Sequence, residues 1–245
     1  MLRHPTLEKL IAMRFAGMAT ALEEQMQTSG IEDLGFEDRL GLLLDREQAV
    51  RETNRMKSRL RKAKLQQNGS VEDIDFKHPR GLDKSLALRL ADCQWIKNHN
   101  NLIITGPTGT GKSYLACAFA EKACRDGFSA LYLRTAKLFE NMSMAKGDGR
   151  YLRLLTTFAK TDLLVLDDYG LAPLTQEHRH DLLEILEDRH NLKSTLMTSQ
   201  LPVENWHERI GDPTIADAIL DRVVHNAHKI KLKGESMRKK TANLT

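Results

Sequence analysis

The sequence contains no apolar run close to the length that a membrane-spanning helix requires. Crossing a bilayer takes about 20 consecutive apolar residues, and every apolar stretch here is far shorter. The residues from Met1 to Pro5 also lack the apolar segment of a secretory signal peptide. We therefore expect a cytoplasmic protein without a membrane partner. The 245 residues, 41% of them hydrophobic, suffice for one large domain or for a core domain with a smaller one.

Cysteine is scarce, with only Cys93, Cys117 and Cys124 in the chain. Their number is odd, and their spacing fits neither a zinc site nor a redox pair. This usage agrees with a cytoplasmic location. Cys117 and Cys124 lie seven residues apart in a helical pattern, so we expect them in the core.

Internal repeats, low-complexity tracts and the helix-turn-helix or zinc-finger signatures of base-specific recognition are also absent. The net charge of +4 is mild, but residues 45–64 hold eight Lys or Arg against three Asp or Glu, and residues 225–240 hold six against one. Such clusters suit phosphate backbones, although a solvated helix face is an equally open interpretation. The candidate DNA-binding residues are Arg55, Lys57, Arg59, Arg61, Lys62 and Lys64.

The most informative motif is the glycine-rich octapeptide at 106–113. It follows an apolar run at 102–105 and precedes a helical pattern at 114–124. This order of strand, loop and helix is typical of the phosphate-binding P-loop, in which backbone N–H groups surround an anion, the lysine reaches the phosphates and the last hydroxyl binds Mg²⁺. We therefore expect a bound nucleoside triphosphate. The candidate binding residues are Gly106, Pro107, Thr108, Gly109, Thr110, Gly111, Lys112 and Ser113.

Two acidic residues follow another apolar run, Leu163 to Leu166. A carboxylate at the end of a strand beside the P-loop strand can hold Mg²⁺ directly or through water, and we assign this role to Asp167 together with Ser113. Asp168 comes next and would polarise the attacking water. The sequence thus predicts a magnesium site completed by Asp167.

Two further groups of polar residues are candidates for contact with the transferring phosphoryl group. Ser199 and Gln200 end an apolar strand that can lie between the P-loop strand and the strand of Asp167, although a simple strand-ending turn is nearly as plausible. Arg222 and Arg238 would stabilise charge on the phosphoryl group, from the same subunit or from a neighbour. For a lone arginine, an ordinary surface position is the alternative.

The hydrophobic periodicity predicts a helical region followed by an α/β domain. Residues 1–66 have helical patterns, including one amphipathic helix over 7–26, and a polar linker with a glycine places the boundary at residue 68. From residue 71 strands alternate with helices, which implies a parallel sheet covered on both faces. The expected strands are 102–105, 129–134, 162–168, 194–199 and 229–233, and the expected helices are 82–97, 112–126, 136–144, 151–159, 175–189 and 215–228.

The order of these motifs resembles the IstB family of AAA+ ATPases, the helper proteins encoded beside the transposase in one class of bacterial insertion sequences. This family is closely similar to the DnaC-type replicative helicase loaders. The resemblance spans nearly the whole chain, and the segments from Ile210 to Lys239 are specific where the P-loop is generic. It implies a P-loop NTPase fold of the AAA+ type, with a parallel five-stranded sheet, over residues 69–245. A small all-helical domain for DNA binding and oligomerisation would occupy residues 1–68, and the C-terminal lid would be truncated or absent.

The resemblance also implies roles for single residues. Lys112 and Ser113 match the Walker A positions, and Asp167 matches the magnesium aspartate. Asp168 stands where many AAA+ members have a glutamate, so the shorter acid implies slow hydrolysis.

Gln200, with Ser199 beside it, matches the sensor 1 position. Arg222 matches the arginine finger, which acts on the ATP of a neighbouring subunit. Arg238 matches the sensor 2 position.

The partners implied by the resemblance are ATP, Mg²⁺, duplex DNA and a cognate transposase. A homo-oligomer with ATP at its subunit interfaces would assemble on target DNA with little sequence preference, deform it and recruit the transposase, and hydrolysis would release it.

Three other functions compete with this interpretation. A replicative helicase loader would share the fold and the ATP site, but would prefer single-stranded DNA. A small-molecule P-loop kinase would need an acceptor pocket and an arginine-rich lid, for which the sequence gives no sign. A DNA-binding scaffold would use ATP only as a structural ligand and would not depend on Asp168.

Overall fold

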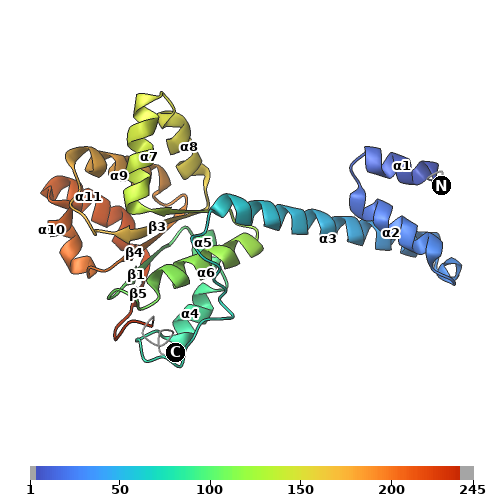
Figure 1. Cartoon of the computed structure of the whole chain (residues 1–245), viewed down its shortest axis with the longest axis horizontal. Helices are drawn as coiled ribbons and strands as arrows, with labels where there is room; N and C mark the ends of the chain where they lie inside the picture. Colours follow the sequence, from blue (N-terminus) through green and yellow to red (C-terminus); the bar gives the residue numbers. More distant parts are fainter. Residues whose placement is uncertain (1–3, 238–245) are drawn as a thin grey trace, which may run out of the picture. The chain divides into compact units, whose positions relative to one another are not determined.

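The computed structural model describes residues 4–237. The chain divides into two compact units, residues 1–58 and 59–245, each with its own internal contacts (Figure 1). Arg238 lies outside the described residues. No helix in the described part of the chain has the length and apolar character needed to cross a membrane.

The first unit is helical. Its elements are α1 (Pro5–Ala12), α2 (Ala16–Gln27), the 3-10 helix η1 (Ile31–Asp33) and α3 (Phe36–Ala63), of which α3 continues past the unit boundary. The single amphipathic helix expected over residues 7–26 is wrong, because the chain reverses at Arg14, which has a φ of +62°. The carboxylate of Glu47 on α3 accepts the N–H groups of Gly17 at 2.8 Å and Met18 at 3.2 Å, and so caps α2 from outside the helix.

The second unit is built on a five-stranded sheet in the order β2-β3-β4-β1-β5, with parallel pairing throughout. The strands are β1 (Asn101–Thr105), β2 (Ala130–Arg134), β3 (Leu163–Tyr169), β4 (Ser194–Ser199) and β5 (Ala227–Lys231). The expected position of β4 between the P-loop strand and the strand of Asp167 is confirmed. The expected strand at 229–233 begins two residues earlier, and the helix expected over 215–228 ends at Val224.

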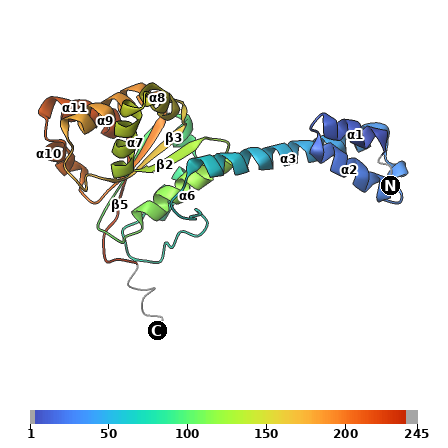
Figure 2. The same cartoon turned by 45° about the horizontal axis from the view of Figure 1, so that its top comes forward.

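Helices cover both faces of this sheet (Figure 2). They are α4 (Lys84–Leu90), α5 (Gln94–Lys97), α6 (Lys112–Arg125), α7 (Thr135–Gly147), α8 (Tyr151–Lys160), α9 (Gln176–Arg189), α10 (Trp206–Ile210) and α11 (Pro213–Val224), with a 3-10 turn η2 (Val203–Asn205). The single helix expected over 82–97 is interrupted at Cys93, whose φ is +59°.

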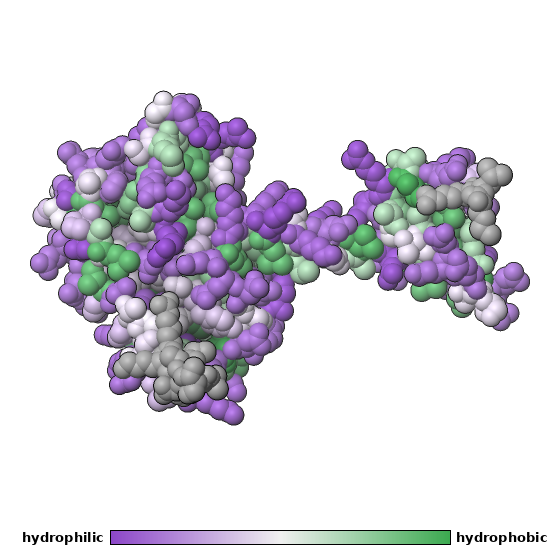
Figure 3. Space-filling model, viewed as in Figure 1, coloured by the Kyte–Doolittle hydropathy of each residue, from purple (hydrophilic) through white to green (hydrophobic). Residues whose placement is uncertain are grey.

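Alternate residues of each strand belong to two separate hydrophobic clusters. Leu102 and Ile104 join the cluster of α6, whereas Ile103 joins the cluster of α7, α9 and α11. This alternation is the period of two that a sheet covered on both faces requires. All three cysteines are buried in the α6 cluster, as expected for Cys117 and Cys124. Hydrophilic side chains predominate on the surface seen in Figure 3.

Candidate nucleotide-binding site

The P-loop connects the last residue of β1 to the first residue of α6. Gly106, Gly109 and Gly111 have φ values of +150°, +83° and +92°, a region that side chains with a Cβ atom rarely adopt. A Cβ on Gly106 would lie 2.6 Å from the carbonyl oxygen of Leu232. The chain after β5 also contacts the loop directly, since the N–H of Met237 donates to the Gly109 oxygen at 2.9 Å. The expected strand–loop–helix context is therefore confirmed.

Lys112 is buried inside this loop. Its Nζ donates to the carbonyl oxygens of Gly106 at 2.8 Å and Pro107 at 2.9 Å. Burial lowers the pKa of Lys112, and the nearby carboxylates of Asp168 and Asp167 oppose that shift. These acids favour the charged ammonium, which is the form that attracts a triphosphate.

Asp167 lies on β3 and is fully buried. Its Oδ1 accepts hydrogen bonds from the hydroxyls of Ser113, at 3.1 Å, and Thr198. Its Oδ2 accepts a hydrogen bond from the hydroxyl of Tyr132 on β2. Three hydroxyl groups thus stabilise a carboxylate that would otherwise be costly to bury.

The donor set fits Mg²⁺. Asp167 and Ser113 present hard oxygen atoms side by side, and Mg²⁺ commonly takes one or two protein oxygens together with phosphate oxygens and waters. Within residues 4–237 no group of three or more His, Cys, Asp or Glu is arranged to hold a metal by itself. The phosphates would therefore have to supply part of the coordination.

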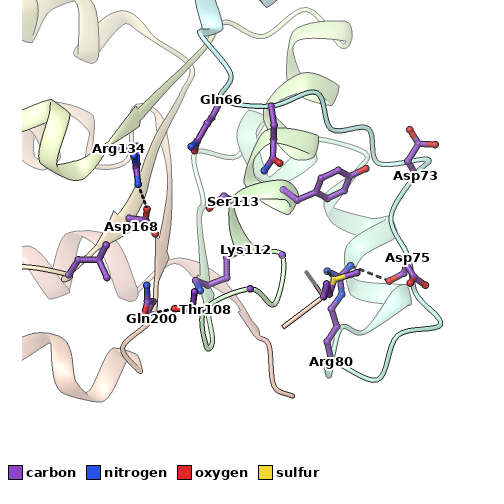
Figure 4. A pocket seen from close by; sticks show the side chains of 16 residues that line it. Gln66, Asp73, Asp75, Arg80, Thr108, Lys112, Ser113, Arg134, Asp168 and Gln200 are labelled. Atoms are coloured by element: carbon purple, nitrogen blue, oxygen red, sulfur yellow. Dashed lines mark hydrogen bonds and ion pairs between the residues drawn. The ribbon is translucent and has the colours of Figure 1, made fainter. Parts of the chain in front are cut away.

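Asp168 lies at a bulge in β3, where the pairing with β4 shifts between Leu166 and Tyr169. Its φ of +59° turns the side chain out of the strand alternation, and its N–H donates to the Thr198 hydroxyl at 3.0 Å. The carboxylate faces the pocket, where it pairs with Arg134 at 3.3 Å (Figure 4). Asp168 is thus held beside Asp167, but its carboxylate points into the pocket, whereas that of Asp167 is buried.

The two candidate sensor residues at the end of β4 have different surroundings. Gln200 lines the pocket, and its Oε1 accepts a hydrogen bond from Thr108 of the P-loop at 2.8 Å (Figure 4). Ser199 is fully buried, and its hydroxyl donates to the carbonyl oxygen of Tyr169 at 2.8 Å. The carbonyl oxygen of Ser199 accepts a hydrogen bond from the N–H of Gly106 at 3.2 Å, but of the two side chains it is that of Gln200 that contacts the P-loop and lines the pocket.

Arg222 lies at the opposite end of the sheet from the P-loop of its own chain. The side-chain amide of Asn101, the first residue of β1, donates to the carbonyl oxygen of Arg222 at 3.0 Å, whereas the P-loop begins after the last residue of that strand. Five strand residues span about 13 Å. The Arg222 guanidinium pairs with Glu187 at 2.9 Å.

The pocket has a volume of about 780 Å³ and combines predicted and unpredicted residues (Figure 4). It is lined by Gln66, Gln67, Asp73, Asp75, Arg80, Thr108, Gly109, Gly111, Lys112, Ser113, Tyr114, Arg134, Asp168, Leu171, Gln200 and Met237. Arg80 is buried, and it donates to the carbonyl oxygen of Thr110 in the P-loop at 3.0 Å and to that of Asp75 at 3.1 Å. The sequence around Arg80, Pro-Arg-Gly, did not indicate that this arginine would contact the P-loop.

Tyr132 and Thr198 were also missed, because both stand in ordinary strand patterns. Burial, followed by the hydrogen bond to Asp167, raises the pKa of Tyr132, so its phenol keeps the proton. The alternation of β2 and β4 alone would have placed both residues near Asp167, had the order of the strands been known.

The candidate DNA-binding residues are spread along the C-terminal half of α3 and beyond its end. Arg61, Lys62 and Lys64 are exposed. Arg59 differs, because its Nε donates to the carbonyl oxygen of Cys124 at 2.8 Å and so caps the C-terminal end of α6. A structural role thus accounts for Arg59 within its own unit.

Comparison with known protein families shows the family of this chain. Residues 8–245 match the family described as IstB-like ATP binding protein. The chain belongs to this family. A Sinorhizobium fredii protein named as an insertion sequence ATP-binding protein (y4pL) is 54% identical over 239 residues, 98% of each chain. The ATP-binding protein of insertion sequence IS21 from Pseudomonas aeruginosa is 30% identical to this IstB-like chain over 235 residues, 96% of this chain and 89% of that one.

Solved structures confirm the AAA+ type of fold. The DnaC helicase loader is 22% identical, with a TM-score of 0.56 over 70% of the IstB-like chain and 100% of that chain. DnaI is 24% identical, with a TM-score of 0.57 over 72% of this chain and 93% of that one. DnaA bound to AMPPCP and single-stranded DNA is 17% identical, with a TM-score of 0.56 over 70% and 52% of the two chains. At these identities the likeness concerns the fold alone.

Proposed function

We propose that this protein is an ATPase that helps transposition. It assembles with ATP and Mg²⁺ on target duplex DNA, deforms the DNA and recruits the transposase of its insertion sequence, and hydrolysis releases it. The observation that carries the proposal is a P-loop site with an adjacent oxygen-donor pair, in a chain that matches an insertion sequence ATP-binding protein over 98% of its length.

Each residue of the site has a different role in ATP hydrolysis. Lys112 and the loop N–H groups bind the phosphates, while Ser113 and Asp167 would hold Mg²⁺, which would neutralise charge on the phosphoryl oxygens. Asp168 faces the pocket and accepts a proton from the attacking water. Gln200, in contact with the P-loop, orients that water. Arg238, outside the described residues, remains the proposed sensor 2 residue.

Arg222 acts on the ATP of a neighbouring subunit. Its own P-loop lies at the other end of β1, farther away than an arginine side chain extends. A guanidinium supplied across an interface makes the site a shared one, so nucleotide and oligomer depend on each other. The family resemblance supports the same role.

Duplex DNA binding rests on the basic residues of α3, with Arg61 and Lys62 as the exposed pair within the second unit. Neutralising phosphates releases counterions, so the affinity falls as the salt concentration rises.

Residues 1–68 serve as the domain for DNA binding and oligomerisation. Seven of the twelve large hydrophobic side chains exposed in the described part of the chain lie within residues 11–44, and this agrees with oligomerisation through that region.

A binding experiment tests this function. Gel-shift titrations compare duplex and single-stranded DNA of one sequence, with ATP and Mg²⁺, at two salt concentrations. We expect tighter binding to the duplex, a steep loss with salt, and weaker binding by the double variant Arg61→Gln/Lys62→Gln. The matched control, Arg153→Gln/Lys160→Gln on α8, removes the same charge elsewhere and should bind like the unmodified protein. A clear preference for single strands would instead indicate a helicase loader.

A further inference from the structure

The hydroxyl of Tyr132 lies between the proposed Mg²⁺ aspartate and the segment that follows α3. It donates to the Oδ2 of Asp167, and Oε1 of Gln66 lies 2.5 Å from the same phenol oxygen. Tyr132 is 5% exposed, whereas Gln66 is exposed and lines the nucleotide pocket (Figure 4). One buried hydroxyl therefore touches both the metal site and the chain that leaves α3.

We infer that Tyr132 is a positioning residue for Asp167, and that Gln66 in turn holds Tyr132. This inference rests on the proposed function only in requiring that Asp167 and Ser113 hold Mg²⁺ with a nucleotide. Neither Tyr132 nor Gln66 touches the metal in this arrangement. Each acts through the orientation of the next group.

The hydrogen bonds of Asp167 explain why its orientation needs support. The Tyr132 hydroxyl fixes Oδ2, which leaves Oδ1 on the side of Ser113, where the metal would lie. Without that bond the carboxylate is held through Oδ1 alone, by the hydroxyls of Ser113 and Thr198, and it is freer to rotate about Cβ–Cγ and turn Oδ1 away from the metal. Hydrogen-bonded partners of metal ligands typically contribute a factor of about 10 to 100 in metal affinity.

The hydroxyl has a single proton, and the charged carboxylate is the stronger acceptor. The Tyr132 hydroxyl therefore donates its hydrogen bond to Asp167. Its oxygen can then accept a hydrogen bond from Gln66, whose side-chain amide presents its NH₂ group when it is rotated by half a turn about the Cγ–Cδ bond. Such a chain of hydrogen bonds is mutually reinforcing. The segment after α3 is thus tied to the metal site through one side chain.

The test measures metal binding directly. Electron paramagnetic resonance reports Mn²⁺ binding to the full chain saturated with a non-hydrolysable ATP analogue, and fluorescence reports nucleotide affinity in EDTA. For Tyr132→Phe, which removes only the hydroxyl, we expect the Mn²⁺ Kd to rise about 10-fold or more. The nucleotide affinity in EDTA should stay unchanged, because Lys112 and the loop are intact.

Tyr169→Phe is the matched control. Tyr169 is also buried, and its hydroxyl has no hydrogen-bond partner in the described part of the chain. Losing a buried hydroxyl there should leave the Mn²⁺ Kd unchanged. Equal Mn²⁺ affinities for Tyr132→Phe and the unmodified protein would overturn the inference, as would equal losses in the two phenylalanine variants.

Gln66→Ala extends the test and keeps it decisive should Tyr132→Phe fail to fold, since Gln66 is exposed. We expect its Mn²⁺ Kd to rise about two- to tenfold, the contribution of one hydrogen bond, with no added loss in the Tyr132→Phe background. An unchanged Kd in Gln66→Ala removes Gln66 from the inference. If the unmodified protein binds neither Mn²⁺ nor nucleotide, the proposed function itself has failed.

Discussion

Single residues of the site differ in how they are held. Lys112 is fixed by its own loop, while Asp167 depends on hydroxyls from three other elements, contributed by Ser113, Thr198 and Tyr132. Asp168 has a left-handed backbone at a bulge, and this conformation turns its carboxylate into the pocket. We therefore propose separate tasks for the two neighbouring acids, metal binding for Asp167 and proton acceptance for Asp168.

Asp168→Asn separates these tasks. The amide cannot accept a proton from water, so we expect ATP hydrolysis to fall by about 100-fold or more, with ATP and Mn²⁺ binding retained because Asp167 and Lys112 are unchanged. Phosphate release and nucleotide fluorescence measure the two quantities. Asp188→Asn, an exposed change on α9, is the control. Undiminished hydrolysis would contradict the role of Asp168 as the group that accepts the proton.

The cysteines give a second prediction at this scale. Burial raises the pKa of Cys93 to about 12 and that of Cys124 to about 11, and it also raises the pKa of Cys117. The reactive form of cysteine is the thiolate, so the folded protein should react with none of its thiols near pH 8. A chromogenic thiol reagent should detect three thiols after unfolding in urea. Rapid labelling of the native protein would contradict the buried positions.

At the scale of elements, the site depends on three segments that meet at the end of β1. The P-loop, the chain after β5 and the Pro-Arg-Gly segment pack against one another, with Leu232 beside Gly106 and Arg80 beside Gly111. A Cβ on Gly111 would lie 2.4 Å from Nη1 of Arg80. The glycines are thus needed both for the turn and for the approach of other chain segments.

Gly106→Ala tests this packing. The new Cβ would meet the Leu232 carbonyl at 2.6 Å, at a φ of +150°. We expect a loss of about 1–3 kcal/mol in the free energy of unfolding and a weaker affinity for ATP. Gly147→Ala is the matched control, because it ends helix α7 with nothing within 4 Å of the added carbon. Urea unfolding measures both, and equal stabilities would contradict the close approach.

At the scale of the whole molecule, the P-loop and Arg222 lie at opposite ends of the sheet. The P-loop lies at the carboxyl end of β1, and Asn101 at its amino end contacts the chain at Arg222. A subunit therefore offers a phosphate-binding end and an arginine end that do not meet within the same chain. An oligomer can bring the two together.

A mixing experiment tests the shared site. Arg222→Ala should bind ATP but not hydrolyse it, and Lys112→Ala should be inactive for want of phosphate binding. In an equimolar mixture about a quarter of the interfaces would combine an intact Lys112 with an intact Arg222. Activity should therefore reappear in proportion. No recovery, in a mixture shown by light scattering to co-assemble, would exclude an arginine supplied across subunits.

The α/β class, the P-loop and the pair of acids could all be predicted from the amino-acid sequence. These features depend on consecutive residues or on a repeating period, which are local properties of a chain. The predicted helix boundaries were wrong where backbone reversals at Arg14 and Cys93 interrupted a continuous helical pattern. Such reversals are set by packing, and periodicity does not record them.

The tertiary structure alone decided which side chains surround Asp167. Tyr132, Thr198 and Gln66 are distant in sequence and meet only because β2 and β4 flank β3 and the chain after α3 passes beside them. It also decided that Arg222 lies away from the P-loop of its own chain. The physical reason is the same in both cases: strand order and the direction of each strand fix what meets at each end of a sheet, and neither is written in a local pattern.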